Sequence, residues 1–115
     1  MGTRKDYRGP AEAFDKYDAA IALVDGVTRK GAANPYTSGN GWMATYLGKE
    51  GEVAIRLGTD DLEAFLSEHG TERPVSYGSV MKDFAIVPEP IVADAEQLAP
   101  LIRRAHDHVS SLPPK

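Results

Sequence analysis

The stretch that decides the fold reads Trp42-Met43-Ala44-Thr45-Tyr46-Leu47, then Gly48-Lys49-Glu50-Gly51-Glu52, then Val53-Ala54-Ile55-Arg56-Leu57. Its two outer segments are rich in aromatic, β-branched and bulky apolar residues, which favour β-strands. The middle segment has glycine at two positions and charged residues between them, which is typical of a turn. The stretch therefore predicts a β-hairpin with strands over residues 42–47 and 53–57.

Two further segments extend the predicted sheet. Residues 35–38 indicate a short strand within a glycine-rich loop over residues 26–41. Residues 81–87 predict another strand, ended by two prolines because proline cannot donate to a ladder. Residues 71–80 are expected to be irregular. Alternation of apolar residues with Ala54 and Arg56 in the strand 53–57 predicts one buried and one exposed face.

Apolar residues spaced three and four apart predict helices over residues 10–25, 59–70 and 94–112. Thr59 is expected to cap the second helix, and Asp94 with Gln97 predicts a capping box on the third. Pro100 lies near the start of the third helix and is expected to bend or delay it rather than break it. The apolar stripe of the third helix is Leu98, Leu101, Ile102, Ala105, Val109 and Leu112.

Hairpin-joined strands are antiparallel, and three apolar helix stripes need a surface to cover. The order of elements therefore predicts a two-layer α+β fold, with a mostly antiparallel sheet and helices packed mainly on one face. Residues 10–115 are expected to form this single domain, and residues 1–9 a flexible N-terminal arm.

Composition narrows the classes of function. The chain has 115 residues, no cysteine and a net charge of −4. The lack of cysteine excludes disulfides and thiolate-based zinc sites, and it fits the cytoplasm. The first residues lack the apolar segment of a secretory signal, and no apolar run is long enough to span a bilayer, so no membrane partner is expected. The acidic balance disfavours direct nucleic-acid binding.

Two motifs match catalytic or cofactor patterns but lack the structural context these need. Gly39 to Ala44 match a dinucleotide-binding fingerprint, yet a strand rather than a helix is expected to follow the glycines. Ser79 and Lys82 match a serine–lysine pair, which requires a helix where a strand is expected. The histidines, His69, His106 and His108, have no ligand spacing for a metal. Neither an enzyme nor a cofactor is expected.

One set of cationic, amide and aromatic side chains remains, in loops and at strand starts. Such groups would bind an anionic or planar ligand, or anchor a protein partner. The alternative interpretation is structural, with Trp42 and Tyr77 closing the sheet edge and the cations in water. The set comprises Arg29, Lys30, Tyr36, Asn40, Trp42, Tyr77 and Lys82.

Several short motifs also resemble a known family when taken in order. They are Arg29-Lys30-Gly31-Ala32, Asn34-Pro35-Tyr36-Thr37-Ser38, Asn40-Gly41, Ile55-Arg56-Leu57, Tyr77-Gly78 with Val80-Met81-Lys82, and His108-Val109-Ser110-Ser111-Leu112-Pro113-Pro114-Lys115. Over about residues 12–115 the chain is similar to the N-terminal domain family of TfoX/Sxy competence regulators. The resemblance implies an α+β fold of the type shared by YjbR-like and secretion-chaperone-like domains. It also implies transcriptional co-activation through a partner regulator, and it brings no catalytic residues.

The leading hypothesis is therefore a non-enzymatic regulatory or protein-interaction module in the cytoplasm. Its partner is a protein or a second copy of the chain, joined through a sheet edge or a helix face. A small-molecule-binding domain for an anionic or planar ligand is the alternative, and direct nucleic-acid binding is the third hypothesis.

Overall fold

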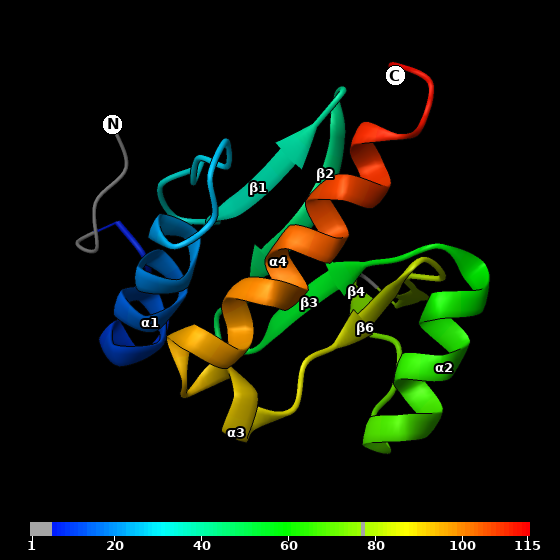
Figure 1. The fold of residues 1–115 in the computed structure, drawn as a ribbon. Helices are drawn as coiled ribbons and strands as arrows, with labels where there is room; N and C mark the ends of the chain where they lie inside the picture. The colour runs from blue at the N-terminus through cyan, green and yellow to red at the C-terminus, as the bar shows by residue number, and fades with distance from the viewer. Residues whose placement is uncertain (1–5, 77) are drawn as a thin grey trace.

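The computed structural model describes residues 6–76 and 78–115. Four antiparallel strands form the main sheet in the order β1-β2-β3-β6, with helices packed mainly on one face (Figure 1). This confirms the predicted two-layer α+β class. The elements are α1 (Ala11–Ala22), β1 (Tyr36–Gly39), β2 (Trp42–Leu47), β3 (Val53–Arg56), α2 (Thr59–His69), β4 (Val75–Ser76), β5 (Ser79–Val80), β6 (Phe84–Ile86), α3 (Glu89–Val92) and α4 (Ala95–Ser110).

The predicted hairpin is confirmed as β2 and β3, where Leu47 pairs with Val53. A second hairpin joins β1 to β2 through Asn40 and Gly41, whose φ angles are 52° and 82°. Two successive positive φ values match the twist of hairpin strands, and asparagine followed by glycine is the pair that adopts them most readily. The register between these strands shifts after Thr37, which marks a β-bulge or similar irregularity.

Helix α4 lies across the face formed by β1, β2 and β3, with α1 beside it (Figure 1). Most of its predicted apolar stripe is buried: Leu98, Ile102, Ala105 and Val109 are each 0% exposed. Each large apolar side chain removed from water in this way contributes roughly 1.5–3 kcal/mol. Leu112 lies beyond the end of the helix at Ser110 and is partly exposed. None of the helices within the described part of the chain is long and apolar enough to cross a membrane.

The start of α4 confirms that Asp94 is its N-cap. One carboxylate oxygen of Asp94 accepts from the backbone N–H of Glu96 at 3.0 Å, and the other accepts from Nε2 of Gln97 at 2.9 Å. Pro100 lies inside the helix, which continues past it to Ser110. The prediction that Pro100 does not break the helix was correct.

Several predicted boundaries were wrong. Helix α1 ends at Ala22, three residues short of the predicted end. Gly58 rather than Thr59 is the N-cap of α2, and no side chain caps that end, while Gly70 ends the helix as expected with φ 60°. The strand predicted over 81–87 is confined to Phe84–Ile86, because the chain turns immediately before Phe84.

Three elements were not predicted, the strands β4 and β5 and the helix α3. The supposedly irregular stretch 71–80 contains the two-stranded hairpin β4–β5, in which Val75 pairs with Val80. Helix α3 begins directly after Pro88, with a second proline in its first turn, where a missing N–H costs no helical hydrogen bond. The prolines that end β6 therefore also start a helix.

The expectation of one exposed face in β3 was wrong at Ala54, which is 0% exposed. Ala54 lies between Tyr46 of β2 and Ile86 of β6, and these larger side chains shelter its methyl group. Within the expected arm, Tyr7 is 6% exposed and packs against Phe14, with ring centroids 5.7 Å apart. Its hydroxyl also donates to the carbonyl of Gly48, so this residue is anchored.

Both outer strands of the main sheet are partly covered. Beside β1, Lys30 and Tyr36 exchange two backbone hydrogen bonds of 2.8 and 2.9 Å. Beside β6, the N–H of Ile86 donates to the carbonyl of Glu72 at 3.0 Å, and the hydroxyl of Thr71 donates to the carbonyl of Ile86 at 2.7 Å.

Candidate functional site

The structure distributes the sequence-predicted site residues over separate places. Arg29, Lys30 and Tyr36 lie around the start of β1, whereas Asn40 and Trp42 lie at the turn between β1 and β2. Lys82 lies in the turn that leads into β6. Tyr77 falls outside the described residues. None of the others lines the pocket of about 490 Å³ described below.

The side chain of Arg29 is held in place by contacts with other residues of the chain. Its Nε donates to Oδ1 of Asp18 at 2.6 Å, and a terminal nitrogen donates to the carbonyl of Gly31 at 3.0 Å. The guanidinium also stacks over Phe14, 4.7 Å from the ring centroid. Only 15% of the side chain is exposed. These contacts anchor the loop after α1 to that helix. Arg29 therefore acts as a structural residue, rather than as a cation that binds a ligand or one that stays in water.

The face of the main sheet opposite α4 carries a row of partly exposed side chains. Strand pairing places Tyr36 beside Tyr46, and the buried Ala54 lies between Tyr46 and Ile86, so the row runs across the four strands with a buried position at Ala54. Met81 joins this row, because the hydroxyl of Tyr46 donates to its Sδ at 3.6 Å. We call Tyr36, Tyr46, Arg56, Met81 and Ile86 the open face.

Arg56 is fixed within the open face by four contacts. Its Nε donates to the carbonyl of Met43 at 2.8 Å, and a terminal nitrogen pairs with Asp83 at 3.4 Å. The guanidinium lies 4.6 Å from the ring centroid of Phe84 and 5.5 Å from that of Trp42. These contacts preorganise the side chain of Arg56. It therefore loses little conformational entropy when a partner binds over it.

Tyr46 contributes a neutral hydroxyl to the open face. Burial, and then the nearby carboxylate of Glu52, raises its pKa above the ordinary value for tyrosine. Its ring packs against Phe84 with centroids 5.7 Å apart. Near neutral pH the hydroxyl therefore keeps its proton and acts as a hydrogen-bond donor.

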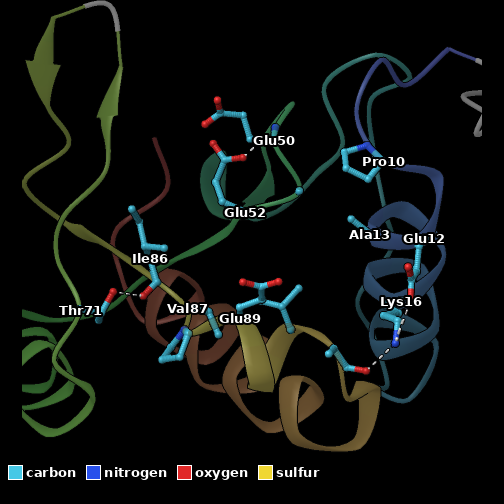
Figure 2. Close-up of a pocket in the computed structure, with 14 residues that line it drawn as sticks. Pro10, Glu12, Ala13, Lys16, Glu50, Glu52, Thr71, Ile86, Val87 and Glu89 are labelled. Carbon is cyan, nitrogen blue, oxygen red and sulfur yellow. Dashed lines mark hydrogen bonds and ion pairs between the residues drawn. The ribbon is translucent and has the colours of Figure 1, made fainter.

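The β4–β5 hairpin projects away from α4 (Figure 2), and Met81 of the open face follows it directly in the chain. Its paired residues Val75 and Val80 are 65% and 53% exposed. The exposed Lys82 follows the hairpin, and Lys30 lies at the β1 border with its Nζ donating to the hydroxyl of Ser38 at 2.9 Å. The near-symmetrical order valine, serine, tyrosine, glycine, serine, valine over 75–80 was the sequence signal for this hairpin.

The structure also contains a pocket of about 490 Å³, which adjoins the open face at Ile86 (Figure 2). Its walls come from the start of α1, the turn between β2 and β3, and the segment from β6 to α3. Four carboxylates and one ammonium line it, from Glu12, Glu50, Glu52, Glu89 and Lys16. The four carboxylates come from three segments that are distant in the sequence, so no local pattern indicated that they lie together.

The ammonium in the pocket is already engaged. Nζ of Lys16 donates to the carbonyl of Ala93 at 2.8 Å and lies 3.7 Å from the carboxylate of Glu12. Val87 and Val92 supply apolar surface to the same pocket. The pocket therefore combines an apolar wall with an excess of negative charge, the opposite sign from the anionic-ligand site expected from sequence.

The two motifs set aside on sequence grounds lack the helix that each of them requires. Gly39 and Trp42 flank a hairpin turn, and Ser79 lies in β5 with Lys82 in the following turn, so no helix spaces that pair. Among residues 6–76 and 78–115, no three histidine, aspartate or glutamate side chains form a group able to hold a metal.

A scan against models of protein families, a search of curated proteins and a search of solved structures each gave no match to this chain.

Proposed function

We propose that this protein is a non-enzymatic interaction module of the cytoplasm that binds a protein partner through its open face. The observation that carries the proposal is the partly exposed row of Tyr36, Tyr46 and Ile86 across the sheet, with Arg56 stacked beside it. Tyrosine, methionine and arginine are enriched at the centres of protein interfaces.

The surroundings of the open face support this proposal. The residues of the row stand on paired strands whose other face is packed under α4, so a partner meets a rigid surface and little order has to be gained on binding. Met81 adds an adaptable thioether, and Val75 and Val80 of the hairpin before it add exposed apolar area. The likeness to TfoX/Sxy N-terminal domains favours a transcription regulator as the class of partner.

Quantitative capture from a lysate of the source cells tests the proposal with charge-introducing variants of exposed residues. Wild type and Leu23→Glu are expected to retain a common partner, because Leu23 is 58% exposed and lies at the end of α1, away from the open face. Val75→Glu and Tyr36→Glu are expected to lose that partner. Light scattering of the purified chain shows whether the partner is a second copy. The proposal fails if every captured protein binds all four chains equally.

A second candidate function rests on the acidic pocket. Its volume lies in the range of small-molecule sites, and its carboxylates attract a cation rather than the anion expected from sequence. We propose an alternative role in binding a small amine or guanidinium compound that contacts Glu52 and Glu89. Thermal-shift assays with spermidine, arginine amide, ATP and phosphate distinguish the two charge classes.

The pocket hypothesis has its own matched control. Stabilisation by spermidine or arginine amide is expected to disappear in Glu52→Gln and Glu89→Gln but to persist in Glu68→Gln. Glu68 belongs to α2 and is not among the residues that line the pocket. No shift with either cation removes this candidate while leaving the open-face proposal untouched.

A further inference from the structure

The segment that follows α4 returns to the turn between β1 and β2 (Figure 1). The side-chain amide of Asn40 donates from Nδ2 to the carbonyls of Ser110 and Leu112, at 2.9 and 3.2 Å. The indole Nε1 of Trp42 donates to the carbonyl of Pro113 at 2.9 Å. Two of the residues selected from the sequence as a binding site therefore contact the chain's own end.

Lys115 completes this arrangement. Its backbone N–H donates to the carbonyl of Asn40 at 2.9 Å, and its Nζ lies 5.1 Å from the ring centroid of Trp42. A cation within about 6 Å of an indole is attracted by the negative face of the ring. We call Asn40, Gly41 and Trp42 the corner. Lys115 also packs closely on Gly41, since a Cβ added at Gly41 would lie 3.1 Å from the Cβ of Lys115.

These contacts are of the kind that recognise extended proline-rich segments. Consecutive prolines fix φ and lack a backbone N–H, so their carbonyls are the hydrogen-bonding groups that they offer. Aromatic side chains with an N–H donor bind such carbonyls and cover the pyrrolidine rings. The corner supplies an indole N–H and two carboxamide N–H groups as donors, a carbonyl acceptor, and an aromatic ring for a cation.

We propose that the corner is a binding site for an extended leucine-proline-proline-lysine segment. Residues 112–115 are its intramolecular ligand, and a segment of the same chemistry in another protein displaces them. Four of the recognised features belong to the segment: the carbonyls of Leu112 and Pro113, the backbone N–H of Lys115 and its ammonium. The fifth, the carbonyl of Ser110, belongs to the last residue of α4. The inference does not depend on the open face or on the acidic pocket.

Displacement costs little because the hydrogen bonds of the corner are exposed to solvent. Water can therefore replace each of them in turn, without the cost of a buried unsatisfied group. The short connection to α4 gives the intramolecular segment a high effective concentration. An external segment thus binds weakly until the internal one is released.

Trp42 is the only tryptophan of the chain, so its indole gives a single N–H signal in a two-dimensional NMR spectrum. The test uses the full chain, its Lys115→Glu variant and the double variant Pro113→Ala/Pro114→Ala. The indole signal is expected to move toward that of a free indole in both variants, while the backbone spectrum of the sheet is retained. The wild-type signal is expected not to depend on protein concentration.

The peptide acetyl-Leu-Pro-Pro-Lys-amide is then added to each chain. It is expected to bind Lys115→Glu about tenfold more tightly than wild type, because the internal segment no longer occupies the corner most of the time. Lys82→Glu, an equal charge reversal at an exposed site, should behave as wild type.

Three results would overturn the proposal. The first is an indole signal that does not change in either variant. The second is equal affinity of Lys115→Glu for this peptide and for acetyl-Leu-Ala-Ala-Lys-amide. The third is a wild-type signal that shifts with dilution, which would assign the bound segment to a second copy.

Discussion

Three buried hydroxyl groups join α1 to the sheet. Oγ1 of Thr45 lies 2.7 Å from Oη of Tyr17 and 2.7 Å from Oγ1 of Thr37, and all three residues are 0% exposed. Burial raises the pKa of Tyr17 far above the ordinary value for tyrosine, so its hydroxyl keeps its proton. Because water is excluded, these hydroxyls depend on one another for hydrogen bonds.

Removing the central hydroxyl is expected to be the most costly single change in this group. Thr45→Val removes the hydroxyl that both of the others contact and should lower the free energy of unfolding by about 2–4 kcal/mol, whereas Tyr17→Phe should cost about 1 kcal/mol. Urea denaturation measures both values. The triple variant that also carries Thr37→Val should recover part of the loss, since it leaves no orphaned hydroxyl. Equal costs for the two single variants would contradict this account.

Sequence reasoning identified residue types at the candidate sites but not their partners. It chose Arg29 for its charge, yet the carboxylate of Asp18 lies eleven residues earlier and meets it through the loop after α1. It chose Asn40 and Trp42, and the structure places the end of the chain against both. Contacts between segments that are distant in the sequence depend on the tertiary fold. Local sequence patterns therefore do not predict them.

At the scale of the element, the cap of α4 makes its stability depend on pH. The amide of Gln97, and then the backbone N–H of Glu96, lowers the pKa of Asp94 below its ordinary value of 3.8. A lowered carboxyl pKa stabilises the folded state at pH values above the unfolded pKa. That contribution is lost as the pH falls through the lower, folded value.

Asp94→Asn is expected to isolate this effect, because asparagine keeps the shape of the cap but not its charge. The melting temperature of wild type should exceed that of the variant at pH 6, and the difference should shrink as the pH falls below 3.8. Thermal melts followed by circular dichroism from pH 2 to pH 7 measure it. A difference that stays constant over this range would show that the charge of Asp94 does not stabilise the helix.

The β4–β5 hairpin is expected to open more readily than the main sheet. Its strands have two residues each, and the paired Val75 and Val80 are mostly exposed. Few buried contacts mean a small free energy of local opening. Hydrogen exchange should therefore be on the order of a hundredfold faster at Val80 than at Ile55 in β3. Similar protection at these two amides would contradict the prediction.

Elements with a strong period were predicted from the sequence, and those without one were not. The stripe of α4 repeats over several turns, so Leu98, Ile102 and Val109 were placed correctly in the core. Strands of two residues cannot show alternation, which is why β4 and β5 were missed. The burial of Ala54 depends on neighbours in two other strands.

At the scale of the molecule, α4 holds the other parts together. It contacts β1, β2, β3, α1 and α3, and Ile102 lies fully buried within it. Ile102→Ala should lower the free energy of unfolding by about 2–5 kcal/mol, through lost burial and the cavity left behind. Leu23→Ala, at a mostly exposed site, should cost less than about 0.5 kcal/mol. Coincident urea transitions by fluorescence and circular dichroism would show that all layers unfold together.

The cover along the outer strands has a consequence for behaviour at high concentration. Lys30 occupies hydrogen-bonding positions beside β1, and the backbone at Glu72 does the same beside β6. An uncovered edge strand is a template to which strands from other molecules can add to form fibrils. Because both edge strands are partly covered, a concentrated solution of this protein should resist amyloid growth. Any self-assembly should proceed through the faces of the molecule rather than through its sheet edges.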